Sequence, residues 1–249
     1  MAKDKKIDVI IPLGTGCDWK EHNELKYCLR SIEKNLVDLG KVYVVGHKPS
    51  WLTNVIHIPA EDTLTRNKDG NIINKTLLAC KHPQCSQQFM RISDDQILLQ
   101  PCTIEHLQPG HSGDLKLYGK WRNQKWLNRL KRTYEYLRDN NHTTFNYDIH
   151  IPFVTNKDLF IQTWQNIDFE SDIGYCINTM FFNVNFSTFK NNEYIWQQKC
   201  TIEKPIHCQD IIIDNLKDKR FLGYGPRGLN DHLKIVIKNL FPCKSKYEL

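Results

Sequence analysis

The first hundred residues alternate short apolar runs with longer segments of helical periodicity. The short runs are residues 7–12 (IDVIIP), 41–46 (KVYVVG) and 55–58 (VIHI). Residues 23–39 and 71–80 carry apolar side chains every three or four positions, which is typical of one helix face. We expect Gly40 to end the first of these helices. This order of elements favours a mainly parallel sheet flanked by helices, and therefore an α/β protein.

The length and composition favour one domain. A chain of 249 residues buries a full core, and no internal repeat, low-complexity tract or linker divides residues 1–249. The charged start and the short apolar run after it do not fit a signal peptide or a membrane span. Nine cysteines without an evenly spaced framework indicate reduced thiols. We therefore expect a cytoplasmic protein without a membrane span.

Two adjacent aspartates, Asp94 and Asp95, stand between the alternating segment Gln88–Ile92 and the apolar run Ile97–Leu99. Alternation predicts a strand, so the pair falls where one strand ends and another begins. Ligands of parallel α/β sheets bind beyond the carboxyl ends of strands. Adjacent carboxylates repel each other, and a bound cation offsets that repulsion. A solvated turn is the alternative, because Asp is also a favoured turn residue.

These segments resemble two families of enzymes. The apolar first strand, the helices with Leu29–Ile32 and Asn71–Lys75, and the strand ending in Ser93-Asp94-Asp95 resemble the GT-A fold of nucleotide-sugar glycosyltransferases. The same region resembles the Stealth family of sugar-phosphate transferases through four segments: Lys26–Ile32, Tyr43–Val45, Pro49–Leu52 and Ser93–Asp95. The resemblance covers roughly residues 7–100, and the chain lacks the tryptophan-valine-aspartate-glycine segment with which Stealth sequences open.

The GT-A resemblance implies a single Rossmann-like domain, with a nucleotide-sugar-binding half at about residues 1–115 and an acceptor-binding half at about 116–249. In that family an acidic motif holds a divalent metal against the nucleotide diphosphate. Asp95 and Asp94 would therefore bind Mn²⁺ or Mg²⁺ here. Many GT-A enzymes add a late histidine as a ligand, and His207 and His232 are the candidates.

The donor site is expected at the end of the first strand and on the second helix. Pro12, Leu13 and Gly14 follow the first strand and would receive the nucleoside. Asn71 and Lys75 lie one helical turn apart on one face and would point at the diphosphate, together with Asp94. A lysine binds phosphate as a point charge.

Asp148 and His150 are two residues apart, and hence on the same face if the segment is extended. A carboxylate and an imidazole side by side suit proton transfer or metal ligation. The Stealth family also carries a His-x-Pro after its acidic motif. Asp148 would act as the base for the acceptor hydroxyl if transfer inverts the anomeric centre. Retention needs no such base, and the sequence leaves this choice open.

Residues 116–138 are basic and rich in aromatic side chains. The plain interpretation is an amphipathic helix with its basic face in solvent. The functional interpretation is an acceptor site with Lys125, Trp126 and Arg129. The sequence thus predicts a metal-dependent glycosyltransferase acting on a glycan, or on a hydroxymethylated base in phage-type DNA. A Stealth-like sugar-phosphate transferase and a non-catalytic nucleic-acid-binding module are the alternatives.

Overall fold

The computed structural model describes residues 6–115, 124–186 and 197–249. A five-stranded sheet has the order β3-β2-β1-β4-β6. Its strands are β1 (Ile7–Leu13), β2 (Leu39–Gly46), β3 (Ile56–Ile58), β4 (Gln88–Arg91) and β6 (Phe153–Asn156). The first four pair in parallel and β6 pairs antiparallel to β4. The expected mainly parallel α/β sheet is confirmed.

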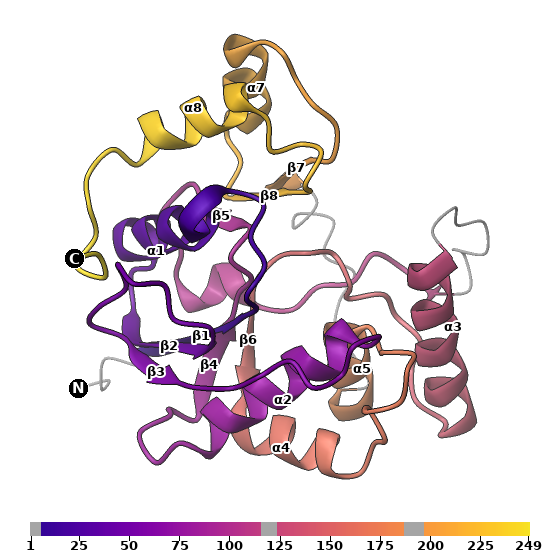
Figure 1. The fold of residues 1–249 in the computed structure, drawn as a ribbon. Coiled ribbons are helices and arrows are strands. Elements are labelled where there is room, and N and C mark those ends of the chain that lie inside the picture. The colour runs from indigo at the N-terminus through magenta and orange to yellow at the C-terminus, as the bar shows by residue number, and fades with distance from the viewer. Residues whose placement is uncertain (1–5, 116–123, 187–196) are drawn as a thin grey trace.

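Helices flank this sheet on both sides (Figure 1). The helices of the described ranges are α1 (Asn23–Asn35), α2 (Lys68–Lys81), α3 (Gln124–Asp139), α4 (Lys157–Gln165), α5 (Ile177–Asn185), α7 (Gln209–Leu216) and α8 (Asp231–Leu240), with the 3-10 turns η1 (Lys20–His22) and η2 (Ile104–Leu107). Of these, α7 and α8 pack on each other apart from the five-stranded sheet, and α3 packs on α5. α2 packs on β1 and β2 and carries α4 behind it, on the side of the sheet away from α1. None of the helices in the described ranges is long and apolar enough to cross a membrane.

A second, three-stranded sheet lies beside the end of β4. It consists of β5 (Gln96–Leu98), β8 (Phe221–Tyr224) and β7 (Lys199–Ile202), in the order β5-β8-β7. Gln96 and Thr201 both pair with Gly223, from opposite sides. The small sheet therefore brings residues from the last fifth of the chain next to the Asp94–Asp95 turn.

The end of the first helix differs from the sequence prediction. α1 ends at Asn35, whereas the periodicity predicted a helix to residue 39. Val37 donates its backbone N–H to Cys102, and Asn35 donates its side-chain amide to the Leu98 carbonyl oxygen, so these tertiary bonds replace the last helical turn. Gly40 lies inside β2 instead of capping the helix. A Cβ atom there would lie 2.5 Å from an Asp8 carboxylate oxygen, so glycine permits a close approach of β1.

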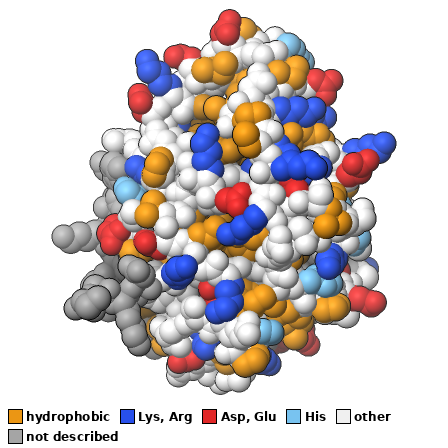
Figure 2. All heavy atoms as spheres, turned by 90° about the vertical axis from the view of Figure 1, so that its left-hand side faces the viewer, with side chains coloured by type: hydrophobic (Ala, Val, Ile, Leu, Met, Phe, Trp, Pro, Cys, Tyr) orange, Lys and Arg blue, Asp and Glu red, His pale blue; other side chains and the backbone are white. Residues whose placement is uncertain are grey.

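The C-terminal segment returns to α1. Arg30 of α1 makes a bidentate ion pair with Glu248, with both N–O distances 2.7 Å. The ammonium groups of Lys34 and Lys238 lie over the rings of Phe241 and Trp19. Figure 2 views the molecule from this side and shows basic side chains interspersed with apolar and acidic ones. Charge on this face is thus mixed, and the aromatic rings under the lysines hold the terminal segment to the core.

Candidate active site

The acidic pair occupies the turn between β4 and β5, as predicted from the sequence. The backbone N–H of Gln96 bonds the Ser93 carbonyl oxygen at 3.2 Å, and the Gln96 side chain accepts from the Ser93 N–H at 3.0 Å. These two hydrogen bonds fix the turn from which the side chains of Asp94 and Asp95 project. His150 approaches from the segment before β6, and its Nε2 atom lies 3.5 Å from Oδ2 of Asp95.

Two backbone features place the His150 ring. His150 has a φ of 52°, in the left-handed region that residues other than glycine rarely adopt. Its ring lies against the backbone of Gly223 in β8, where a Cβ atom would be 2.9 Å from the ring carbon Cδ2. Gly223 therefore makes room for the imidazole beside Asp95. The predicted pairing of Asp148 with His150 is not observed. His150 lies beside Asp95, whereas Asp148 contacts Trp126 and Arg129.

Negative charge and burial dominate the electrostatics of the turn. Burial raises the pKa of Asp94 to about 7, with further contributions from the charges of Asp95 and Glu24, while Lys68 acts in the opposite direction. Three buried polar atoms nearby have no hydrogen-bond partner among the residues that the structure describes: Oδ1 of Asp95, Oε2 of Glu24 and the hydroxyl of Tyr224. Unsatisfied buried oxygen atoms are costly unless a ligand contacts them. Oxygen donors of this kind suit Mg²⁺ or Mn²⁺.

The two histidines late in the sequence, His207 and His232, lie next to each other. The rings of His207 and His232 meet edge to face, 6.1 Å apart. Within residues 6–115, 124–186 and 197–249, no three His, Cys, Asp or Glu side chains are already arranged to hold a metal ion. His150 is the histidine whose ring nitrogen reaches toward Asp95. Ligation by His207 stays a prediction.

The predicted donor residues lie where the parallel strands end, but two of them have internal partners. Lys75 is buried; its ammonium group donates to the Leu13 carbonyl oxygen at 2.8 Å and pairs with Asp62 at 2.6 Å. The side-chain amide of Asn71 both donates to and accepts from the backbone of Leu64. These two side chains shape the loop before α2. Pro12, Leu13 and Gly14 do lie at the carboxyl end of β1.

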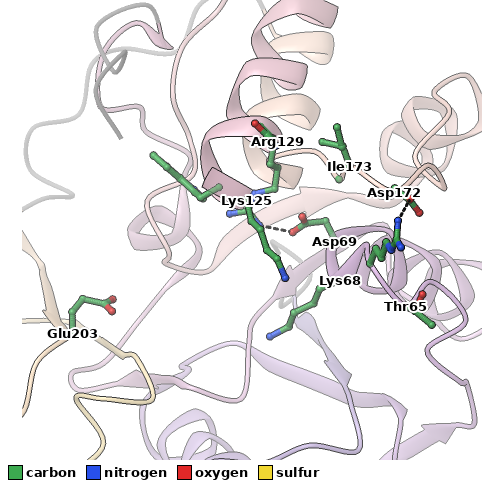
Figure 3. A pocket seen from close by; sticks show the side chains of 12 residues that line it. Thr65, Lys68, Asp69, Lys125, Arg129, Asp172, Ile173 and Glu203 are labelled. Atoms are coloured by element: carbon green, nitrogen blue, oxygen red, sulfur yellow. Dashed lines mark hydrogen bonds and ion pairs between the residues drawn. The ribbon is translucent and has the colours of Figure 1, made fainter. Parts of the chain in front are cut away.

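A cavity of about 1020 Å³ opens between the first turns of α2 and α3. Its walls carry Thr65, Arg66, Lys68, Asp69, Lys125, Trp126, Asn128, Arg129, Asp172, Ile173, Gly174 and Glu203. Figure 3 shows Lys68 and Lys125 projecting into the same space from two helices, with Glu203 on a separate wall. Lys68 also faces Asp94, whose pKa its charge lowers. Lys68 thus relates the cavity to the acidic turn by its charge, while Asp94 and Asp95 do not themselves line the cavity.

Two arginines and two aspartates support the back of this cavity. Arg129 pairs with Asp69 at 2.8 Å and with Asp148 at 3.5 Å, and Trp126 donates its indole N–H to Asp148 at 3.2 Å. Burial acts to lower the pKa of Arg129, but the two carboxylates outweigh it and raise that pKa. The charges of the same carboxylates also face Arg91, whose pKa burial lowers to about 10. The positive charges of the two arginines thus balance the negative charges of the two aspartates.

The basic residues of the predicted acceptor surface differ in their contacts: some have partners within the protein, and another projects into the cavity. Residues 116–123 lie outside the described residues. α3 follows the predicted amphipathic pattern, with Leu130 and Leu137 buried. Arg129 is engaged by two carboxylates, and Arg132 donates to the carbonyl oxygens of Ile173 and Asp168. The two arginines therefore act as internal ties, and Lys125 is the basic predicted acceptor residue that projects into the cavity.

Sequence reasoning missed Lys68, Glu203 and Arg91. Lys68 was missed because α2 begins three residues before the predicted start, at an N-cap formed by Asn67, whose side chain accepts from the Gly70 N–H. An Asn before a charged first turn is a recognisable start signal. Glu203 and Arg91 carry no local signal, because only long-range packing brings them to the site.

Comparison with known proteins places the chain near no established family. No family model matches it, and no curated protein matches. Among solved structures, an active-site mutant of LgtC is similar with a TM-score of 0.46 and 9% sequence identity, over 94% of this chain and 95% of that one. A similarity of this degree defines neither the reaction nor the substrates of the chain.

Proposed function

We propose that this protein is a metal-dependent glycosyltransferase, which moves a sugar from a nucleotide-sugar donor to an acceptor hydroxyl. The observation that carries the proposal is the Asp94–Asp95 turn at the end of β4. One buried oxygen of Asp95 is unpartnered there, and His150 lies 3.5 Å from the other. A cavity of about 1020 Å³, whose wall carries Lys68, is large enough for sugar rings.

The donor atoms of the turn are of the kind that a divalent metal binds, although the side chains of the described residues are not yet gathered around one point. Asp95, Asp94 and His150 would hold Mn²⁺ or Mg²⁺, which neutralises charge on a departing nucleoside diphosphate. Glu24 and Tyr224 lie behind the pair with unpartnered oxygens and would order water around the ion. His207 stays a candidate for a further ligand.

The donor would lie along the carboxyl ends of β1 and β4. Pro12, Leu13 and Gly14 would border the nucleoside, as the sequence predicts. Lys68, which is exposed and faces Asp94, is better placed than Lys75 to contact the diphosphate. Lys75 and Asn71 would act indirectly, since their polar atoms hold the strand end and the loop before α2.

The acceptor would enter the cavity between α2 and α3. Trp126 and Ile173 offer apolar surface to a sugar face, and Lys125 offers a charge at the rim. Arg129 would act by holding Trp126 and Asp148 in position. We propose a glycan acceptor, because the arginines of α3 are occupied within the protein and leave less basic surface for a nucleic acid.

Donor binding and product analysis test this proposal. A panel of nucleotide sugars is screened by thermal shift with Mn²⁺ and with EDTA. A true donor raises the melting temperature by mass action, and only with the metal. The product of turnover separates the alternatives, since glycosyl transfer releases a nucleoside diphosphate and sugar-phosphate transfer releases a nucleoside monophosphate. If no nucleotide sugar stabilises the protein with either metal ion, the proposal is wrong.

A further inference from the structure

We infer that Cys85 and Cys80 form a redox-active thiol pair, in which Cys85 attacks a hydroperoxide and Cys80 then closes a disulfide with it. The pair lies in the connection between α2 and β4, which joins β4 at the end opposite to the β4–β5 turn (Figure 1). This site is independent of the proposed glycosyltransferase function. Three features of the connection point to it: the contact between the two thiols, the charges around Cys85 and the orientation of the histidine between them.

The two thiols lie next to each other because the chain turns directly after α2. The backbone N–H of His82 donates to the Ala79 carbonyl oxygen, and that of Cys85 donates to the His82 carbonyl oxygen, both at 3.0 Å. Cys80 is in the last turn of α2, and a hydrogen bond joins its side chain to that of Cys85. A disulfide requires the two sulfur atoms at about 2 Å. Two thiols in hydrogen-bond contact therefore need only a short approach to form one.

The surroundings of Cys85 favour its thiolate. The hydrogen bond from the Cys80 thiol lowers the pKa of Cys85, against the effect of burial. The charges of Lys157 and Lys41 also lower this pKa, and that of Asp8 raises it. Lys157 is fixed there, since its ammonium group donates to the Cys85 carbonyl oxygen at 3.1 Å. The thiolate is the nucleophilic form of cysteine, and neighbouring lysines promote it.

The same hydrogen bond has the opposite effect on Cys80. It raises the pKa of Cys80, and burial raises that pKa further. Cys80 therefore keeps its proton and directs it toward the sulfur atom of Cys85. The two cysteines are thus unequal: Cys85 is suited to attack an oxidant, and Cys80 is suited to resolve the product.

Other buried cysteines differ from Cys85. The residues Cys28, Cys102 and Cys176 are at most 1% exposed, and burial raises the pKa of each thiol. Cys85 keeps 5% of its surface exposed, which allows the approach of an oxidant as small as hydrogen peroxide. Buried cysteines of the first kind are inert, whereas a thiol with a lowered pKa and contact with solvent is reactive.

The histidine between the two cysteines does not complete a metal site with them. Nδ1 of His82 accepts the Gln84 backbone N–H at 3.3 Å, and the His82 ring meets the Tyr43 ring edge to face, with centroids 5.6 Å apart. In the described part of the chain, no three His, Cys, Asp or Glu side chains are arranged to hold a metal ion. A structural zinc site needs four ligands. The arrangement therefore suits thiol chemistry better than metal binding.

The reaction takes two steps. The Cys85 thiolate attacks one oxygen atom of hydrogen peroxide, the O–O bond breaks, and hydroxide leaves with the electron pair and takes up the proton that Cys85 had released. The sulfur atom of Cys80 then attacks the sulfenic acid at Cys85, the S–O bond breaks, and the hydroxide leaves as water with the proton of Cys80. Two thiols are oxidised to one disulfide, and one peroxide is reduced to two water molecules. An external thiol reverses the change by exchange.

Peptide mapping of the wild-type protein tests the pair directly. The reduced, folded protein is treated with hydrogen peroxide, alkylated with iodoacetamide and digested with trypsin. Trypsin cleaves after Lys81 and so separates the two cysteines. The two peptides stay joined only through a disulfide between Cys80 and Cys85, so we expect a joined peptide that dithiothreitol splits. Its absence under conditions that oxidise the exposed Cys17 would overturn the inference.

Serine variants separate the roles of the two cysteines, because serine keeps a hydrogen-bond donor at each position. In Cys80→Ser the second step is blocked, so the sulfenic acid should persist at Cys85 and react with dimedone. Cys85→Ser should lose the disulfide and show little dimedone label at Cys80. Cys17→Ser is the control and should form the disulfide at the wild-type rate. Circular dichroism verifies the fold of each variant. Labelling of Cys80 in Cys85→Ser as fast as that of Cys85 in Cys80→Ser would contradict the assigned roles.

Discussion

The Nε2 atom of His150 lies 3.5 Å from Oδ2 of Asp95 because Gly223 leaves room for the imidazole ring. One contact therefore links the β4–β5 turn, the segment before β6 and the small sheet. Only a residue without a side chain in β8 permits it. If the acidic turn binds a metal, the size of the residue at 223 controls the histidine beside that metal.

Gly223→Ala is expected to displace His150 and weaken metal binding. The new Cβ atom would meet the ring carbon at 2.9 Å, and the half-exposed ring can move away at little cost to the fold. Displacing a group that orients a metal site costs about 10–100-fold in affinity or activity. Titration with Mn²⁺, followed by thermal shift, measures the effect. Gly16→Ala is the control for stability, since no atom lies within 4 Å of a Cβ atom there. Unchanged Mn²⁺ affinity in Gly223→Ala would exclude His150 from the site.

Asp95→Asn is expected to abolish the response to metal. The substitution keeps the shape of the side chain and removes one charge from the turn. We expect turnover to fall by at least about 10²-fold, the usual cost of removing one electrostatic contact to a developing charge. The Mn²⁺-dependent thermal shift should disappear as well. Asp139→Asn, on an exposed side chain of α3, is the matched control. Equal activity with Mn²⁺ and with EDTA in the wild type would contradict the metal site itself.

Lys68 and Lys75 are expected to have different roles. Lys68→Ala should raise the donor KM by about tenfold, which corresponds to one charge-assisted hydrogen bond of about 1.5 kcal/mol. Lys75→Ala should instead lower stability by about 1–3 kcal/mol, since it removes a buried donor to the Leu13 carbonyl oxygen and the partner of Asp62. Kinetics and urea unfolding of both variants separate the roles, with the exposed Lys131→Ala as control. A change in KM for Lys75→Ala with normal stability would restore the sequence prediction.

Arg129→Ala is expected to destabilise the protein more than loss of a surface arginine. Removing one partner of a buried ion pair costs about 3–5 kcal/mol. Because the Arg129 side chain is 27% exposed, we expect a value at the lower end of that range. Arg138→Ala breaks an exposed pair with Asp139 and should change stability little, because solvent screens that pair. Urea denaturation measures both. Equal stability of the two variants would show that the Asp69 and Asp148 carboxylates do not depend on Arg129.

The ion pair between Arg30 and Glu248 predicts a pH-dependent contribution to stability. Burial acts to raise the pKa of Glu248, but the bonds from Arg30 and Ser245 outweigh it, so the pKa is lowered from its ordinary value of 4.5. A carboxyl group with a lowered pKa in the folded state stabilises that state fully above its unfolded pKa. The contribution is lost as the pH falls through the lowered value. Thermal unfolding of wild type and Glu248→Gln should therefore differ at pH 7 and converge well below pH 4.5. A difference that is the same at every pH would show that the charge of Glu248 is not its source.

The sequence by itself determined the local elements and the position of the acidic pair. β-branched runs form strands and spaced apolar residues form helices because these patterns bury one face of each element. Asp94 and Asp95 follow a strand because a run of alternating residues ends just before them. The amphipathic face of α3 was predictable for the same reason. Each of these features depends on neighbours within a few residues.

Tertiary structure decided where α1 ends, which carboxylates are free and which histidine meets Asp95. The helix ends at Asn35, whose side chain bonds Leu98, and Val37 bonds Cys102, in each case more than sixty residues away. Asp148 is engaged because Arg129 and Trp126 of α3 pack against it, and no local sequence pattern predicts that contact. The side chain of His150 lies beside Asp95 because a glycine more than seventy residues later, Gly223, leaves room for its ring. Such contacts depend on which segments pack together, and that is settled only when the whole core forms.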